Sequence, residues 1–165
     1  MAIAAVLFWS AGGPALAQGG FTPDPALASL GKTLWKEQVP CRECHGGLGN
    51  GIPDIPQQPS GANLRTTKLS PEDLAITIRC GRPGTEMPYF DSKAYTDKRC
   101  YDVTAADLGP AQPPASMALT DRQVNALVAF IFATFVGKGD PTFESCVALW
   151  GEGASTCARY PRAGR

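Results

Sequence analysis

Apolar residues recur at helical spacing in three segments of the chain, separated by polar and turn-forming residues. In residues 24–38, leucines and a tryptophan lie three or four positions apart, as on one face of a helix. These residues are Leu27, Leu30, Leu34 and Trp35. We therefore expect a first helix whose apolar face packs against a later helix.

The second segment carries start and stop signals of a helix. Ser70 is a preferred N-cap residue, and Pro71 is favoured at the first helical position. Leu69 is spaced to pack against Leu74 across this start. Gly81 is expected to end the helix.

The third segment, from about residue 120 to 136, begins with a capping box of Thr120 and Gln123. Gly137 is a suitable terminator. Its apolar stripe consists of Val124, Leu127, Val128, Ile131 and Phe135. No strand pattern or internal repeat of note accompanies these segments, so the expected fold class is all-α, with about three main helices.

Composition limits the size and the partners of the protein. With 165 residues and 44% hydrophobic content, the chain is long enough for one compact domain. The 18 glycines and 15 prolines indicate long irregular loops between the helices. Because 15 basic residues balance 15 acidic ones, nothing suggests a nucleic-acid-binding protein.

The N-terminus has the pattern of an export signal. The apolar run Ala2–Trp9 is broken at residues 12–14, and Ala15-Leu16-Ala17 has the small-x-small form of a cleavage site. A transmembrane helix is the alternative, but the run is shorter than the roughly 17 to 25 residues that a bilayer requires. We interpret residues 1–17 as a signal peptide and expect a periplasmic protein.

Residues 41–45 read Cys-Arg-Glu-Cys-His and contain the only histidine of the chain. In the attachment pattern of c-type haem, two such thiols (Cys41 and Cys44) add to the vinyl groups, and the histidine (His45) binds the iron. A thioredoxin-like dithiol would require a βαβ setting, and a zinc site would require a second Cys or His pair. The motif therefore predicts one covalent haem c.

The second axial ligand has to come from another residue type, because no second histidine exists. Met87 lies in a loop, residues 82–90, whose glycine and prolines restrict its conformations. Met117 is the alternative ligand, and it has a competing interpretation as packing beneath the third helix.

Four of the six cysteines lie outside the haem motif. In an oxidising compartment such thiols tend to form disulfides, and four cysteines allow three pairings. We expect the local pairing, Cys80 with Cys100 and Cys146 with Cys157, and interpret both bonds as structural.

Taken together, these residues resemble a class I monohaem c-type cytochrome of the exported bacterial kind. The resemblance covers roughly residues 24–137 and rests on the spacing of the motifs. These motifs are Gly31 with Trp35, the segment 41–46, the Gly/Pro-rich loop, Met87-Pro88 with Phe90, and the Leu-Thr-Asp start of the last helix at residue 119. The resemblance implies a cytochrome c fold in which the first and last helices cross at Gly31 and Trp35.

The resemblance also implies that a proline carbonyl accepts the Nδ1 proton of His45 and orients the imidazole. Pro53, Pro56 and Pro59 are available, and we expect Pro56.

Two segments depart from the short members of that family. An insert at about residues 91–118 follows the Met87 loop, and a tail, residues 140–165, follows the cytochrome domain at 18–139. The tail is expected to be a disulfide-pinned surface extension, with a docking segment for a larger partner as the alternative. If Cys80 bonds Cys100, the insert brackets the ligand loop.

With histidine on one side of the iron and methionine on the other, no coordination position stays open. We therefore expect an electron carrier and not an enzyme. No acid–base pair or nucleophile constellation competes with this interpretation. The resemblance implies a periplasmic carrier or a cytochrome subunit. Its redox partners would be an exported dehydrogenase or a bc1-type complex on one side and a terminal oxidase or reaction centre on the other.

Two alternatives stay open. A five-coordinate haem would make the protein a sensor or a minor peroxidase. A haem module fixed in a membrane complex would reach the membrane through a partner or an uncleaved N-terminus.

Overall fold

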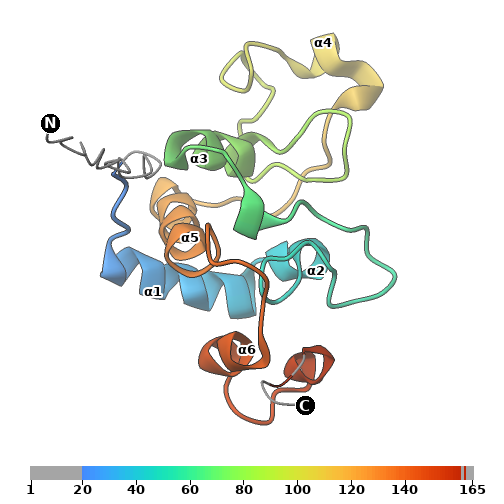
Figure 1. Ribbon diagram of the computed structural model, residues 1–165. Helices are drawn as coiled ribbons and strands as arrows, with labels where there is room; N and C mark the ends of the chain where they lie inside the picture. Colours follow the sequence, from blue (N-terminus) through green and yellow to red (C-terminus); the bar gives the residue numbers. More distant parts are fainter. Residues whose placement is uncertain (1–19, 161, 163–165) are drawn as a thin grey trace, which may run out of the picture.

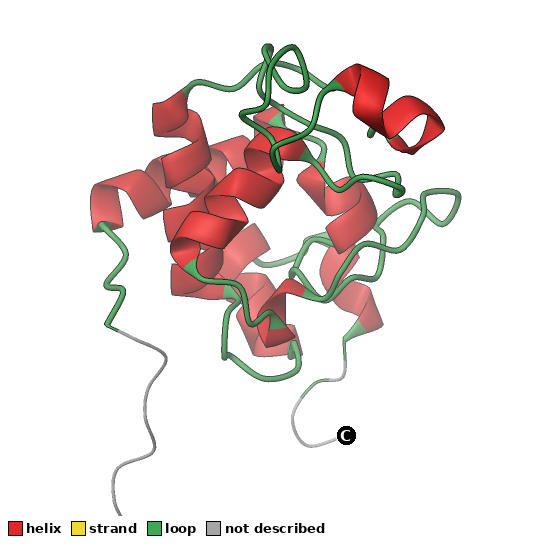
Figure 2. Ribbon diagram, turned by 90° about the horizontal axis from the view of Figure 1, so that it is seen from above, coloured by secondary structure: helices red, strands yellow, loops and turns green. Residues whose placement is uncertain are grey.

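The computed structural model describes residues 20–160 and Arg162, so the expected signal peptide at 1–17 lies outside the described residues. The described residues form helices and loops, with no strand among them (Figures 1 and 2). The helices are α1 (Pro25–Thr33), α2 (Cys41–His45), α3 (Pro71–Cys80), α4 (Ala105–Leu108), α5 (Asp121–Thr134) and α6 (Phe143–Trp150). A π-helical turn, Leu34–Gln38, extends α1, and short 3₁₀ turns occupy Leu64–Thr66, Gly109–Ala111 and Ser155–Arg159. The all-α prediction is confirmed.

The three helices expected from the sequence begin at the expected caps. The Asp24 carboxylate accepts from two backbone N–H groups at the start of α1. Ser70 accepts from the backbone of Asp73 at the start of α3. Thr120 and Gln123 form the reciprocal capping box of α5. Satisfying these otherwise unpaired N–H groups is what fixes each helix start.

The core forms where α1 and α5 cross. A Cβ atom on Gly31 would lie 2.0 Å from the carbonyl oxygen of Ala126, so only glycine permits this approach. Trp35 is buried beside this crossing, with its ring 5.9 Å from that of Phe130 and 5.1 Å from that of Phe135. The crossing at Gly31 and Trp35 is therefore confirmed.

The insert and the tail lie at opposite ends of the molecule, with α1, α2 and α5 between them (Figure 1). Each carries a disulfide, Cys80–Cys100 with an S–S distance of 2.04 Å and Cys146–Cys157 with one of 1.99 Å. Both expected pairings are confirmed. No helix within residues 20–160 combines the length and the apolar character needed to cross a membrane.

A buried arginine joins the loop after α2 to the segment after α5. Arg65 is 5% exposed, and its guanidinium donates to the carbonyl oxygens of Leu48, Lys138 and Gly139. Because a buried charged group is stable only when its donors are paired, these three bonds fix the two segments to each other.

Candidate functional site

The Cys-Arg-Glu-Cys-His motif forms the short helix α2, which ends at Gly46 with a φ of 75°. Cys41 and Cys44 are one turn apart, half-buried and not disulfide-bonded. Burial raises the pKa of the Cys41 thiol to about 12. Burial also raises the pKa of Cys44, and the nearby Glu43 charge adds to that effect. Both groups are therefore protonated thiols at neutral pH.

His45 is oriented by a hydrogen bond to the backbone. Its Nδ1 lies 2.8 Å from the carbonyl oxygen of Ala62, and because a carbonyl only accepts, Nδ1 carries the proton. The acceptor is thus Ala62, and the prediction of Pro56 is wrong. The loop between them folds back so that the Gly61 N–H donates to the Cys44 carbonyl at 2.8 Å, which brings Ala62 beside the ring. Pro56 lies on the exposed part of the same loop.

The environment of His45 keeps the imidazole neutral. Burial lowers its pKa, while the hydrogen bond to Ala62 acts in the opposite direction. Gly61 lies directly against the ring, since a Cβ there would be 2.7 Å from Nδ1. The Nε2 atom, with its lone pair, is the nitrogen left to bind a metal.

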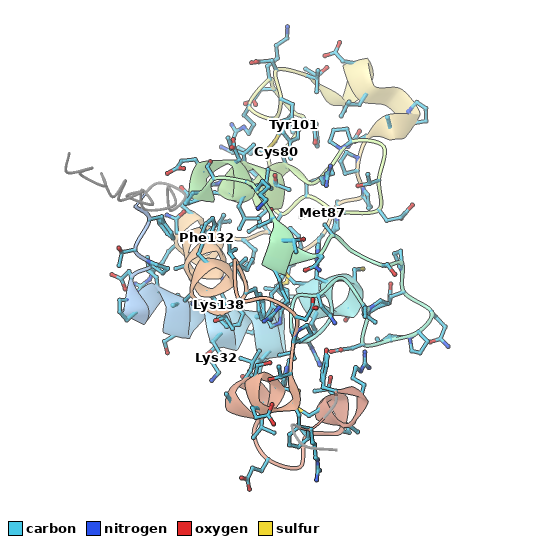
Figure 3. All side chains as sticks on the ribbon, in the orientation of Figure 1. Lys32, Cys80, Met87, Tyr101, Phe132 and Lys138 are labelled. Atoms are coloured by element: carbon cyan, nitrogen blue, oxygen red, sulfur yellow. A yellow bond between two sulfur atoms is a disulfide. The ribbon has the colours of Figure 1, made fainter. Side chains whose placement is uncertain are left out.

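Two adjoining hollows meet at His45 and Met87. One has a volume of about 670 Å³ and the other about 510 Å³, and His45, Ala62, Arg82 and Met87 line both. The second is also lined by Cys41, Cys44 and Phe90. In Figure 3, Met87 lies between α2 and the insert. Met117 is 45% exposed and lines neither hollow.

Bonds within the Met87 loop shape its turn. The Arg82 N–H donates to the Met87 carbonyl at 3.2 Å, and the Met87 N–H donates to the Thr85 hydroxyl at 3.2 Å. The loop therefore presents the thioether from a closed turn and not from an extended chain.

The insert holds the Met87 loop at both ends. At the start, Tyr101 donates from its hydroxyl to the Gly81 carbonyl at 2.9 Å, and Tyr95 donates to the Cys80 carbonyl. At the far end, the Tyr89 N–H donates to the Pro114 carbonyl at 3.0 Å. With the Cys80–Cys100 disulfide, these contacts make the insert a brace for the loop.

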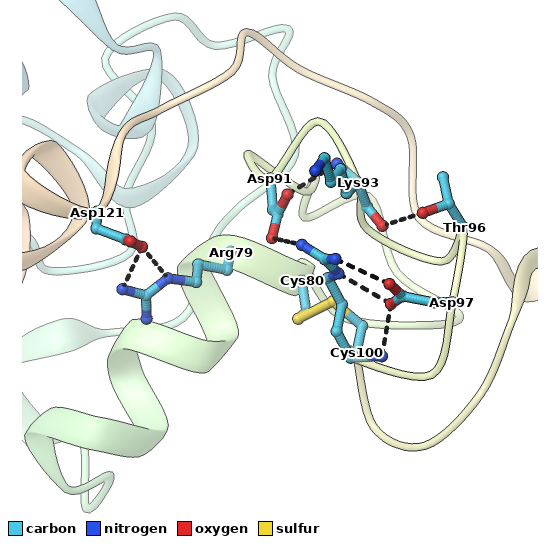
Figure 4. A network of polar contacts seen from close by, with 9 residues as sticks. Arg79, Cys80, Asp91, Lys93, Thr96, Asp97, Cys100 and Asp121 are labelled. Carbon is cyan, nitrogen blue, oxygen red and sulfur yellow. Dashed lines mark hydrogen bonds and ion pairs between the residues drawn. A yellow bond between two sulfur atoms is a disulfide. The ribbon is translucent and has the colours of Figure 1, made fainter.

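Ion pairs fix the insert and α3 in turn (Figure 4). Arg99 contacts Asp97 at 2.8 Å and Asp91 at 3.5 Å. Arg79, at the end of α3, contacts Asp121 at the start of α5 at 3.0 Å. Because water reaches each of these pairs, they add little to stability and serve mainly to orient the segments.

The tail packs against the motif loop, the segment that follows α2 and begins at Gly46. Trp150, at the end of α6, donates from its indole Nε1 to the Gly47 carbonyl at 3.1 Å. Its ring also contacts Lys36 and Arg42, whose charged groups lie 5.1 Å and 5.3 Å from the ring centre. Helix α6 was not expected from the sequence, although Thr142 at its start and Gly151 after its end are typical helix-boundary residues.

Asp54 links the motif to the tail. Its carboxylate accepts from the Gly47 N–H at 3.1 Å and lies 3.5 Å from Arg42 and 4.0 Å from Arg159. Sequence reasoning missed Asp54, Ala62 and Trp150, because nothing in a loop sequence specifies which carbonyl or carboxylate meets a distant partner.

Two thiols, an imidazole nitrogen and a thioether are the attachment and ligand groups of c-type haem. The structure brings all four to one cavity system, in which Phe90, Leu64 and Leu74 supply buried apolar wall. Among residues 20–160, no three His, Cys, Asp or Glu side chains gather as a metal site.

Residues 26–105 match the protein family described as "Cytochrome C oxidase, cbb3-type, subunit III". No curated protein matches the sequence. One similar solved structure is a chain of the reducing HAO-like protein complex of Kuenenia stuttgartiensis, with 21% identity, a TM-score of 0.47, and coverage of 74% of this chain and 50% of that chain. Another is oxidized cytochrome c6A from Arabidopsis thaliana, with 23% identity, a TM-score of 0.43, and coverage of 72% and 99%. The chain thus spans half the length of the first of these structures.

Proposed function

We propose that this chain is a monohaem c-type cytochrome that transfers electrons, and that His45 and Met87 would hold the iron of one covalently bound haem c. Cys41 and Cys44 would form the thioether bonds. When bound, the haem supplies an iron that gains and loses a single electron.

One observation carries this proposal: His45 and Met87 line the same two hollows, and both free thiols line the smaller of them. The imidazole keeps Nε2 available because Ala62 accepts from Nδ1. With both His45 and Met87 bound, the iron would have no position open for a substrate. The function supported best is therefore electron transfer and not catalysis at the iron.

The remaining residues keep the site dry and rigid. Phe90, Leu64 and Leu74 are each less than a tenth exposed and exclude water from the wall of the cavity. The brace formed by the insert resists displacement of Met87, since moving the loop would break backbone bonds at both of its ends. A dry shell and a sulfur ligand both favour a raised potential.

We further propose that the protein works in the periplasm, between an exported dehydrogenase or bc1-type complex and an oxidase or reaction centre. Two disulfides support an oxidising compartment. The family match, described as an oxidase subunit, supports an oxidase as acceptor and keeps a role as a subunit of a larger complex as the second candidate. Release with the periplasmic fraction, with a mature N-terminus at Gln18, tests this location, and recovery only in the cytoplasm would contradict it.

Carbon monoxide tests whether both axial positions are filled. We expect that carbon monoxide does not change the absorption spectrum of the reduced protein at neutral pH, because bound Met87 would block the position that the gas needs. The oxidised protein should accept one electron per chain in a reversible titration. Rapid and complete carbon monoxide binding by the unaltered protein would favour the five-coordinate sensor or peroxidase instead.

A further inference from the structure

The larger hollow is lined by cations without any acid. Lys68 and Arg82 contribute positive charge to it, and Thr67, Thr77 and Tyr101 contribute hydroxyl groups. No Asp or Glu lines this hollow, whereas the smaller one, which contains the thiols, is lined by Glu43 and Glu86 as well as by Arg82. The two sides of the His45–Met87 pair therefore differ in charge.

Neither cation is engaged elsewhere in the described part of the chain. The salt bridges there involve other residues, and both Lys68 and Arg82 are exposed side chains at the mouth of the hollow. Burial raises the pKa of Tyr101, while the Thr77 hydroxyl and, to a smaller extent, the nearby Arg82 guanidinium act against that rise. Two unpaired cations beside an apolar hollow indicate an anionic occupant.

The chemistry of haem identifies that anion. Its two vinyl groups lie on one side of the porphyrin and its two propionates on the other, so thioether bonds at Cys41 and Cys44 direct the carboxylates away from the thiols. The larger hollow contains His45 and Met87 but neither thiol. On the basis of the function proposed above, we propose that Lys68 and Arg82 form a cationic cradle for the haem propionates.

The insert positions one side of this cradle. Tyr101 comes from the insert, and its hydroxyl donates to the carbonyl of Gly81, the residue before Arg82. Its backbone has a φ of 56°, a conformation that non-glycine residues rarely adopt. Tyr101 is therefore a positioning residue: it fixes the backbone from which Arg82 extends, and it lines the hollow.

The two cations of the cradle would also shift the redox equilibrium of the iron. A positive charge near the iron disfavours the oxidised form, which carries one more positive charge than the reduced form. Lys68 and Arg82 thus favour the reduced protein, and they hold the propionates ionised at neutral pH.

Charge-removing variants at the two positions test the cradle. In Arg82→Gln and Lys68→Gln, we expect the ratio of reduced to oxidised protein at a fixed applied potential to fall by about three- to tenfold. The propionate bending band in the resonance Raman spectrum should shift in the same variants. Lys98→Gln is the matched control, because Lys98 is an exposed cation of the insert that lines neither hollow.

Two further variants separate charge from geometry. Arg82→Lys keeps the charge, so we expect the potential to stay near that of the unaltered protein while the Raman band shifts. Tyr101→Phe removes the bond to Gly81 without changing charge, and a smaller shift of the Raman band should follow. Raman bands and potentials that move no further in Arg82→Gln and Lys68→Gln than in Lys98→Gln would overturn the cradle.

The spectrum of the unaltered protein shows whether the cradle alone is wrong or the proposed haem attachment is wrong as well. If it shows covalent low-spin haem with methionine bound to iron, and the charge variants do not move, only the cradle is wrong. If it holds no thioether-linked haem at Cys41 and Cys44, the proposed attachment and the cradle fail together.

Discussion

At the residue scale, the orientation of His45 depends on its neighbours in the loop and not on the motif alone. The Ala62 carbonyl accepts from Nδ1, and Gly61 leaves room for the ring. The motif residues themselves could be predicted, because their spacing is chemically specific. The acceptor could not, because it lies seventeen residues along an irregular loop whose path depends on its own backbone bonds.

Gly61→Ala tests this close approach. A Cβ at 2.7 Å from Nδ1 has to displace the imidazole or the backbone, so we expect a loss of about 1 to 3 kcal/mol in the free energy of unfolding. A weakened low-spin absorption spectrum should accompany it. Ser60→Ala, at the exposed neighbouring position, serves as control and should stay within about 0.5 kcal/mol of the unaltered protein. Equal unfolding midpoints for the two variants would show that the ring is not confined by Gly61.

At the scale of the elements, the crossing of α1 and α5 sets the frame for the site. It brings Trp35 against the buried face of α5, and the motif follows directly after the turn that extends α1. The sequence predicted these helices and α3 because their caps and apolar periods are local properties. It missed α4 and α6, which are only four and eight residues long, too short for hydrophobic periodicity to give a strong signal.

Gly31→Ala tests the crossing. Alanine is the better helix former by about 1 kcal/mol, yet its Cβ would lie 2.0 Å from the Ala126 carbonyl oxygen. We therefore expect a net destabilisation of about 2 kcal/mol or more in chemical denaturation. The control is Ser29→Ala on the exposed side of α1, where helix propensity should dominate and stability should hold or rise slightly. A more stable Gly31→Ala protein is the result that this packing does not allow.

At the scale of the whole molecule, the insert and the tail brace the site from two ends. The insert holds the Met87 loop, and the tail packs on the motif loop through Trp150 and Asp54. The sequence predicted both disulfides but not these contacts, because the partners are far apart along the chain. The division at residues 139 and 140 stays a prediction, although the tail does pack against the domain that precedes it.

Tyr95 makes the brace sensitive to alkali. Burial raises its pKa to about 12, with smaller contributions from Tyr101 and Tyr89, whereas an unfolded tyrosine titrates near about 10. Between those values the unfolded state binds fewer protons than the folded state, so stability falls as pH rises. In urea unfolding at about pH 9 and pH 11, we expect a smaller decline for Tyr95→Phe than for the unaltered protein. An identical decline would exclude Tyr95 as the source.

The far-red charge-transfer band that reports methionine sulfur bound to ferric haem tests directly whether Met87 binds the iron. We predict that the oxidised protein shows this band, that Met87→Ala loses it, and that Met117→Ala, altered at a methionine that lines neither hollow, keeps it. A band that is absent from the unaltered protein, or that survives in Met87→Ala and disappears in Met117→Ala, would contradict the assignment of His45 and Met87 as the axial pair.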